Sequence, residues 1–324
     1  MTAKNMVEAI RDALAEEMER DPTVVLLGED VGRKGGVFKT SDGLQARFGP
    51  LRVLDTPVAE IAIAGVAIGA AMTGLRPVAE FQFADYMHPA YDQIVSQAAT
   101  MRWRSVGTWH VPVVFRAPFG AVAGGGIYHS QSPEAPYCHT PGLKVVAPAT
   151  PSDAKGLLKA AIRDDDPVIF FEHKANYRTI REEVGVDPVP LGVARVDRDG
   201  GDVSIVTYAG GVHVAREAAT ALAEEGINVA ILDLRTLVPL DREAIAATVK
   251  RTGRLLILHE ANKTMGFGAE IAAFAAEELF MDLDAPVRRV AAADSHLTYN
   301  TSEQSAILPD AQDVIAAVRE LLRY

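Results

Sequence analysis

Short apolar runs rich in Val and Ile recur along the chain and alternate with segments of helical pattern. In the first half these runs begin at Thr23, Arg76, Val111, Leu143 and Pro167, and the helical stretches lie near residues 58–74, 84–104 and 151–163. Continuous apolar strands separated by helices are typical of a mostly parallel sheet covered on both faces. The first part of the chain is therefore predicted to form an α/β domain.

A second domain is indicated by a change in composition. The sequence becomes polar and rich in Pro and Gly from Arg181 to Asp202, and the alternation of strands and helices then restarts. The 324 residues exceed one ordinary hydrophobic core. We therefore predict two α/β domains, over residues 1–185 and 203–324, joined by a linker over residues 186–202.

The charge and the cysteine content exclude several classes of protein. The net charge of -11 argues against nucleic acid or an anionic membrane as a partner, because both require a basic surface. The one cysteine, Cys138, cannot form an internal disulfide and does not allow a thiolate-rich metal site. A cytoplasmic, reducing location is expected.

Two segments could be confused with targeting or membrane segments. The N-terminal segment carries acids and an apolar stripe at Val7, Ile10, Leu14 and Met18, which predicts an amphipathic helix and not a signal peptide. The most apolar run, residues 61–75, is shorter than the roughly 20 residues that span a bilayer. It is expected to form a buried helix.

Residues 124–142 read GGGIYHSQSPEAPYCHTPG, a composition that predicts a loop. The glycines lack the patterns of a phosphate-binding loop, the spacing of His129 and His139 around Cys138 matches no familiar zinc site, and no nucleophile elbow occurs. What remains is an imidazole, His129, in a loop that follows a strand, where α/β folds bind ligands. A hydrogen-bonding surface histidine and a functional one both fit.

Glu60 heads a segment whose next fourteen residues carry no charge. Thr56 and Pro57 are expected to be the N-cap and the first residue of this helix. Because burying a carboxylate without a partner is costly, Glu60 needs either the positive end of its own helix or a protonated ring nitrogen of a bound cofactor. Gly65 and Gly69 lie one helical turn apart and suit close helix packing, in an oligomer interface or inside the domain.

Two further clusters allow a structural and a functional interpretation. Aromatic residues surround Gln82, and they could fill the core or hold a flat heterocycle: Phe81, Phe83, Tyr86 and Tyr91. Acids occupy the end of a predicted helix at residues 164–166, where they could be solvated or could bind a cation.

Several motifs together resemble one family, the β subunit of thiamine-diphosphate-dependent 2-oxo acid dehydrogenases, the decarboxylating first component. They are LGEDVGRKGGVF, DTPVAE, LRPVAEFQFADY, YHSQSPEA, PGLKVV, DAKGLLKAAIRDDDPVIFFE and LDLRTLVPLD, in order over nearly the whole chain. The resemblance implies a pyrimidine-binding domain followed by a transketolase-type C-terminal domain.

The resemblance also implies a cofactor shared between chains. The family forms heterotetramers of two α and two β subunits, which dock on a lipoyl acyltransferase core. The α subunit holds Mg²⁺ and the diphosphate of thiamine diphosphate, and the β subunit receives the aminopyrimidine. This division explains why the sequence has neither a phosphate loop nor the metal motif of thiamine enzymes.

Individual roles follow from the resemblance, position by position. Glu60 is implied to bond the pyrimidine ring nitrogen, and His129 to position substrate and move protons during acyl transfer to lipoate. The other pocket positions are Glu29, Val58, Gln82 and Tyr86. A structural potassium site is implied at the Ala161 carbonyl, Asp164 and Asp166, although the family commonly has asparagine at the last position.

The substrate is expected to be a branched-chain 2-oxo acid, because QFADY and YHSQSPEA look closer to the branched-chain type. The alternatives are a pyruvate or acetoin dehydrogenase β subunit, and a non-catalytic assembly subunit of the same fold. The stretch ADSHLTYNTSEQSAILPD departs from the family, which usually has a proline and aromatic run there.

Overall fold

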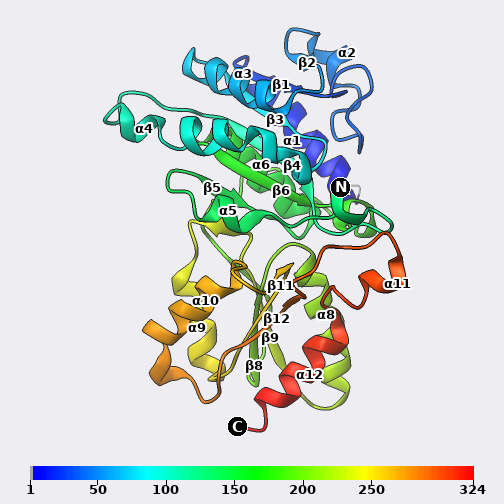
Figure 1. Cartoon of the computed structure of the whole chain (residues 1–324), viewed down its shortest axis with the longest axis vertical. Coiled ribbons are helices and arrows are strands. Elements are labelled where there is room, and N and C mark those ends of the chain that lie inside the picture. Colours follow the sequence, from blue (N-terminus) through cyan, green and yellow to red (C-terminus); the bar gives the residue numbers. More distant parts are fainter. Residues whose placement is uncertain (1–2) are drawn as a thin grey trace. The chain divides into compact units, whose positions relative to one another are not determined.

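A computed structural model describes residues 3–324, which divide into two compact units (Figure 1). The first unit comprises the residues up to Phe119 together with Pro136–Leu191, and the second comprises Gly120–Ala135 together with Gly192–Tyr324. Each unit has an α/β architecture, which confirms the predicted fold class. Residues 120–135 thus group with the second unit although the first surrounds them in the chain.

The strands of the first unit run parallel in the order β5-β6-β4-β3-β1-β2. They are β1 (Val24–Gly28), β2 (Val53–Asp55), β3 (Arg76–Glu80), β4 (Val114–Phe119), β5 (Lys144–Val146) and β6 (Val168–His173). The helical elements are α1 (Met6–Arg20), α2 (Leu44–Phe48), α3 (Glu60–Met72), η1 (Ala84–Ala90), η2 (Gln93–Ala98), α4 (Met101–Arg104), α6 (Pro151–Arg163) and α7 (Asn176–Thr179), and α5 (Glu134–Cys138) spans the unit boundary.

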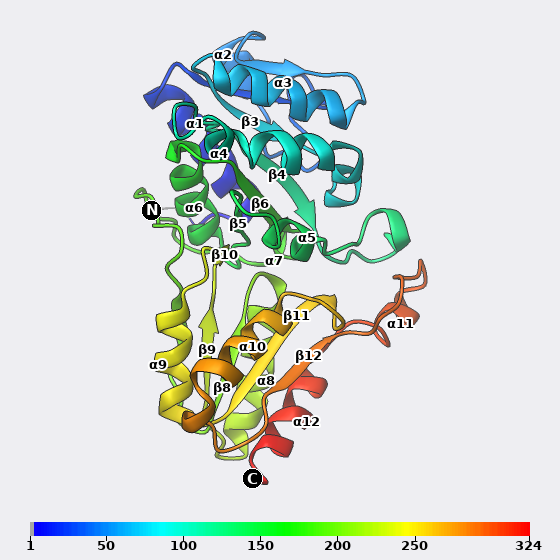
Figure 2. The ribbon, with the colours of Figure 1, turned by 60° about the vertical axis from the view of Figure 1, so that its left-hand side comes forward.

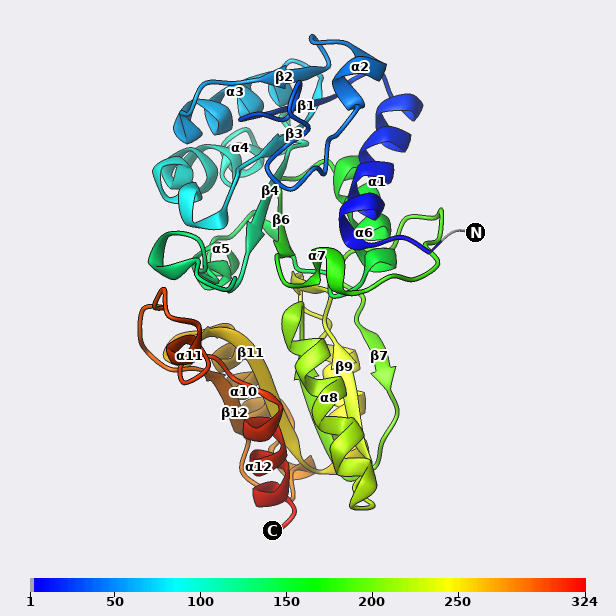
Figure 3. The same cartoon turned by 90° about the vertical axis from the view of Figure 1, so that its right-hand side faces the viewer.

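Helices cover both faces of this sheet, with α1 and α6 on one side and α3 and α4 on the other (Figure 3). The predicted N-terminal helix is confirmed, since its apolar stripe is buried against α6. The Asn5 side chain accepts from the Glu8 backbone N–H, and the Glu8 carboxylate accepts from the Asn5 N–H. This capping box fixes the start of α1.

The expected cap of the apolar helix is wrong. Helix α3 begins at Glu60 with Ala59 as N-cap, so Thr56 does not cap it. The segment over residues 84–104 is helical as predicted, but it consists of a 3₁₀ helix, a π-helix and one short α-helix. Pro89 lies inside the first of these, and a proline lacks the N–H that a continuous α-helix requires.

Helix α3 is also not buried as expected. The side chains of Ile61 and Val66 are 50% and 61% exposed, and a Cβ at Gly69 would meet no atom within 4 Å. When a helix is apolar on all sides, its sequence does not show which face packs against other residues of the same chain. In residues 3–324 no helix combines the length and apolar character needed to cross a membrane.

The sheet of the second unit has the order β12-β11-β8-β9-β7 and is parallel except for β7. The strands are β7 (Arg195–Arg198), β8 (Val203–Thr207), β9 (Val229–Asp233), β11 (Leu255–Asn262) and β12 (Arg288–Ala292), with a short β10 (Thr236–Val238). The helical elements are η3 (Gly126–Tyr128), α8 (Gly210–Glu224), α9 (Arg242–Thr252), α10 (Gly268–Glu278), η4 (Phe280–Asp282), α11 (Thr301–Gln304) and α12 (Ala311–Leu321).

Helices α8 and α12 pack together on one face of this sheet, and α9 and α10 cover the other (Figure 2). Strand β7 lies within the segment expected to be a linker, residues 186–202, and pairs with β9. Its residues are only partly buried, so it lacks the continuous apolar pattern by which most of the strands were predicted. The three-residue strand β2 was not predicted either.

A buried acid, Glu134, lies in the second unit. Its side chain is 1% exposed, and the Tyr208 hydroxyl donates a hydrogen bond of 2.5 Å to its Oε1. Burial raises the pKa of Glu134 from 4.5 to about 7, against the opposing effect of the Tyr208 hydrogen bond. A carboxyl group with such a raised pKa stabilises the fold fully below its unfolded pKa, and this stabilisation is lost as the pH rises through the folded pKa.

Substitution of Glu134 by Gln should therefore stabilise the chain above neutral pH. The amide carries no charge to bury and keeps an acceptor for Tyr208, so the free energy of unfolding should rise by on the order of 2–3 kcal/mol at about pH 8 and change little near pH 5. Urea unfolding at both pH values measures the difference. Glu277→Gln, on an exposed position of α10, is the matched control. Equal effects at both pH values would contradict the assigned ionisation.

Candidate functional site

The strand order of the first unit changes direction at β1. Strand β2 follows it in the chain and pairs on one side, whereas β3 pairs on the other. At such a point the connections leave in opposite directions and open a crevice at the carboxyl ends of the strands. Glu29 follows the last residue of β1, and Gln82 lies two residues beyond β3. Gly28 and Glu80 are aligned in the register, which brings these two strand ends together.

Two carboxyl groups, Glu29 and Glu60, lie close enough to interact at this edge. Burial raises the pKa of Glu29, and the charges of Glu60 and Asp30 raise it further, while a hydrogen bond from the Ala59 backbone acts in the opposite direction. The Glu29 side chain is buried, and its Oε1 accepts no hydrogen bond from residues 3–324. Glu60 is the first residue of α3 and is partly exposed. The site therefore offers a buried acceptor without a donor beside a second acid.

The other predicted pocket residues lie in segments that leave the same edge. Val58 is exposed and stands in the connection from β2 to α3. Tyr86 belongs to η1, after β3, and packs edge to face against Phe83 with ring centroids 5.6 Å apart. Glu29 and Glu60 thus interact at this edge, and Val58, Gln82 and Tyr86 lie in the segments that follow β2 and β3.

A buried charge network next to this edge was not predicted. The guanidinium of Arg116 on β4 donates to Glu172 Oε1 over 2.6 Å and to Glu80 Oε2 over 2.7 Å. Thr40 also donates to Glu80, which ties the loop after Glu29 to the end of β3. Burial raises the pKa of Glu80, and Arg116 opposes that effect. The sequence does contain an indication of a buried ion pair, since Arg116 lies inside the apolar run VPVVFRAP and a buried arginine requires an acidic partner.

His129 lies in the second unit, at the end of η3. The three glycines that precede it are explained by the packing of their own segment. Gly124 and Gly126 have φ of +73° and +58°, and a Cβ at Gly126 would come within 2.3 Å of the Tyr299 ring. A Cβ at Gly125 would lie 2.5 Å from the Ser130 Oγ. The glycine run therefore permits a tight turn of backbone at His129.

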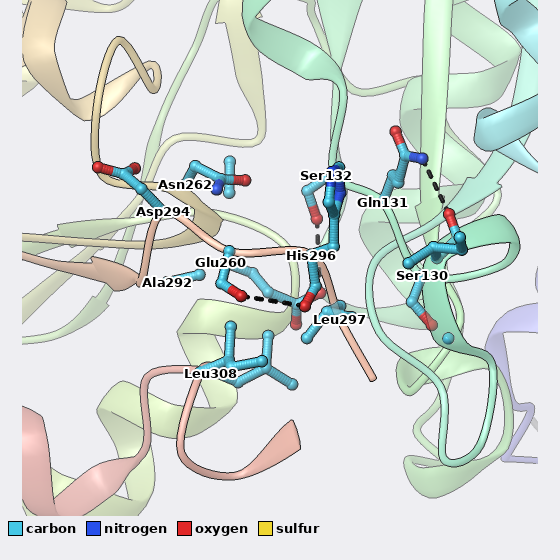
Figure 4. A pocket seen from close by; sticks show the side chains of 15 residues that line it. Ser130, Gln131, Ser132, Glu260, Asn262, Ala292, Asp294, His296, Leu297 and Leu308 are labelled. Atoms are coloured by element: carbon cyan, nitrogen blue, oxygen red, sulfur yellow. Dashed lines mark hydrogen bonds between the residues drawn. The ribbon is translucent and has the colours of Figure 1, made fainter. Parts of the chain in front are cut away.

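A cavity of about 330 Å³ adjoins this loop in the second unit (Figure 4). Ser130, Gln131 and Ser132 line it together with Glu260 and His296. His296 belongs to the stretch ADSHLTYN that departs from the family pattern. No sequence pattern predicted that this stretch and the loop would share a cavity.

The acids predicted to bind potassium are paired with basic side chains. The Lys144 ammonium lies 2.6 Å from both carboxylate oxygens of Asp164, and Arg102 donates to Asp166. The carbonyl of Ala161 accepts from the Asp164 backbone N–H. Among residues 3–324, no group of three or more His, Cys, Asp or Glu side chains is arranged to hold a metal ion.

Comparison with known proteins matches both units to domain families. The transketolase pyrimidine-binding domain matches residues 2–179, and the transketolase C-terminal domain matches residues 192–314. A solved structure described as a split-gene transketolase in an inactive beta4 tetramer is 26% identical, with a TM-score of 0.82 and coverage of 98% of both chains.

Relatives of matching length share about half of the sequence. The 2-oxoisovalerate dehydrogenase subunit beta of Bacillus subtilis is 50% identical, and the pyruvate dehydrogenase E1 component subunit beta of the same organism is 44% identical, each over 100% of both chains. These full-length matches, the two domain families and the paired α/β units agree, and the chain belongs to the family of 2-oxo acid dehydrogenase E1 β subunits.

Proposed function

We propose that the chain forms the pyrimidine side of a thiamine-diphosphate site and, with an α subunit, catalyses oxidative decarboxylation of a 2-oxo acid and acylation of a lipoyl group. The observation that carries this proposal is the buried Glu29 Oε1, which has no donor within residues 3–324, next to Glu60 at the carboxyl edge of the first sheet. An aminopyrimidine presents an exocyclic amino group and a ring nitrogen that donates when it is protonated, so it can donate to two such acids. The residues present therefore fit the cofactor.

The pocket residues have distinct proposed roles. Glu60 bonds the pyrimidine ring nitrogen and holds the proton there, and Glu29 and Gln82 hold the ring edge. Tyr86 contacts the ring face, supported on Phe83, and the backbone at Val58 completes the pocket. Thiamine diphosphate, when bound, supplies the electron sink that the loss of CO₂ requires. Mg²⁺ and the diphosphate would be held by the α subunit.

His129 is proposed to position the substrate and to move a proton during acyl transfer. An imidazole suits this role because its unperturbed pKa lies near neutral pH. Its loop is stabilised by bonds within the second unit, which supports a defined position for the ring. The stretch ADSHLTYN beside this loop differs from the family pattern, so contacts between the two segments are not carried over from the family.

A branched-chain 2-oxo acid is the proposed substrate. The greater identity to a 2-oxoisovalerate dehydrogenase subunit, 50% against 44% for a pyruvate dehydrogenase subunit, supports this choice. Pyruvate and acetoin dehydrogenases are the alternatives, and a non-catalytic assembly subunit is the alternative of another class. The acidic pair Glu29 and Glu60 favours catalysis over assembly alone. A purely structural subunit does not need a buried carboxylate oxygen that has no donor in residues 3–324, whereas perturbed acids are common at catalytic sites.

An α subunit in a heterotetramer of two α and two β subunits is the proposed partner, and a lipoyl acyltransferase core is the larger assembly. The exposed apolar face of α3 supports a subunit contact, since Ile61 and Val66 are at least half exposed and a Cβ at Gly69 would meet no atom of residues 3–324 within 4 Å. We infer a cytoplasmic location from the cysteine content, since a chain with one cysteine, Cys138, cannot form an internal disulfide. Potassium binding at Ala161, Asp164 and Asp166 remains a prediction, and K⁺ would have to share the Asp164 carboxylate with Lys144.

Substitution of Glu60 by Gln should lower the release of CO₂ by roughly a hundredfold or more, because the neutral amide cannot hold the ring proton as a carboxylate does. The assay uses the chain assembled with a cognate α subunit, thiamine diphosphate, Mg²⁺ and a branched 2-oxo acid. Asp30→Asn is the matched control, since it removes the other charge that acts on Glu29. Full activity of Glu60→Gln would exclude the assigned role. Circular dichroism during cofactor titration separates loss of binding from loss of turnover.

The substrate class is tested by turnover of 3-methyl-2-oxobutanoate, pyruvate and acetoin on the same assembled enzyme. We expect kcat/KM for the branched acid to exceed that for pyruvate by about tenfold or more, since one or two additional buried methyl groups contribute about 1–3 kcal/mol. A preference for pyruvate or acetoin would instead select the corresponding sister enzyme.

Substitution of Gly69 by Leu should prevent assembly without unfolding the chain. No atom lies within 4 Å of the added Cβ, and leucine favours helix over glycine by about 1 kcal/mol. Sedimentation with the α subunit should show free chain in place of the heteromer. Ala223→Leu, at an exposed position of α8, is the control and should assemble normally. Normal assembly of Gly69→Leu would remove this face of α3 from the interface.

A further inference from the structure

The second unit has a crevice of the same topological kind as the first. Strand β9 follows β8 in the chain and pairs on one side of it, while β11 pairs on the other. The strand order therefore changes direction between β8 and β11, where open α/β sheets bind ligands. Tyr208 follows the last residue of β8, and Glu260 lies near the carboxyl end of β11.

Both side chains bind the segment Gly120–Ala135. Glu260 Oε1 accepts from the Ala121 backbone N–H over 2.5 Å and from the Ser132 hydroxyl over 3.4 Å. These donors lie on either side of His129, so one carboxylate oxygen joins the two limbs of its loop. The Tyr208 hydroxyl binds Glu134 two residues further on.

The surroundings make this arrangement rigid. The Tyr208 ring lies parallel to the buried His259 ring within 14°, with centroids 6.3 Å apart. A Cβ at Gly268 would come within 2.6 Å of that imidazole, so the Gly268 backbone packs closely against the His259 ring. Burial lowers the pKa of His259 to about 4, which keeps the supporting ring uncharged at neutral pH.

The rest of the unit also holds the loop. The Gln304 side chain donates to the Val122 carbonyl, and the Tyr299 ring packs on Gly126. Within the loop, the Gly120 N–H donates to the Gln131 carbonyl over 3.0 Å. Contacts from β8, β11 and the segment before α12 therefore meet on one short stretch of chain.

We propose that the crevice between β8 and β11 holds Gly120–Ala135 as an internal ligand, and that Glu260 and Tyr208 are positioning residues for His129. The inference rests on the proposed function for the role of His129. A group that transfers protons must be kept within hydrogen-bond reach of its partner, and the second unit supplies that constraint. The second unit thereby contributes to the reaction through the loop that it holds.

Hydrogen exchange in the full chain tests whether the loop is held as proposed. In Glu260→Ala and in Tyr208→Phe, the amides of residues 121–135 should exchange roughly tenfold faster or more, because bonds to a charged or buried acceptor are lost. Glu260→Gln keeps an acceptor oxygen and should lie near the parent. Asp294→Ala is the control, since its carboxylate accepts from Thr264 instead of the loop. Unchanged exchange in both Glu260→Ala and Tyr208→Phe overturns the proposal.

Strand amides of residues 203–207 report whether each variant keeps its fold, and Tyr208→Phe decides the question if Glu260→Ala does not fold. In the enzyme assembled with the α subunit, Glu260→Ala should lower kcat for lipoyl acylation about tenfold with KM for the 2-oxo acid unchanged, and Glu260→Gln should restore it. Faster exchange with unchanged kcat overturns the positioning role. Full lipoyl acylation by His129→Ala overturns the proposed role of His129 and, with it, the positioning role of Glu260 and Tyr208. Whether the crevice holds the loop is decided by hydrogen exchange alone.

Discussion

Parallel strands bring all their carboxyl ends to one edge of a sheet, and the functional geometry of both units depends on this constraint. In the first unit the edge between β1 and β3 collects Glu29 and Gln82 from segments about fifty residues apart in sequence. In the second unit the edge between β8 and β11 presents Tyr208 and Glu260. At the first edge, a buried Glu29 oxygen has no donor among residues 3–324, and at the second edge Glu260 and Tyr208 bind the segment Gly120–Ala135. The same topology is thus proposed to serve ligand recognition in the first unit and loop positioning in the second.

Charge explains why such a chain would work as half of a site. Its net charge is -11, and Glu29 and Glu60 repel each other at the crevice of the first unit. A ligand that donates hydrogen bonds relieves this repulsion, whereas a diphosphate would add to it. The proposed division of the cofactor between two polypeptides, with the anionic end in the partner, is consistent with that balance.

The sequence predicted the strands best, because their apolar runs are continuous and their lengths are short. It also predicted α1, where the apolar stripe and the cap agree. It failed for α3, since a helix that is apolar all round shows no difference between a face covered by its own sheet and an uncovered one. It did not predict β7 or the grouping of Gly120–Ala135 with the second unit, because these depend on contacts between residues far apart in sequence. The roles of Glu60 and His129 came from the resemblance, and their surroundings only from the structure.

The uncovered face of α3 has a consequence for the cell that makes this chain. Ile61, Val66 and Met72 form an apolar strip on α3 that is exposed when the chain is alone. Such a strip binds other hydrophobic surfaces, and newly made chains that expose one are recognised by chaperones and proteases. Synthesis in equal amounts with its partner would keep the strip hidden, and surplus copies would be short-lived.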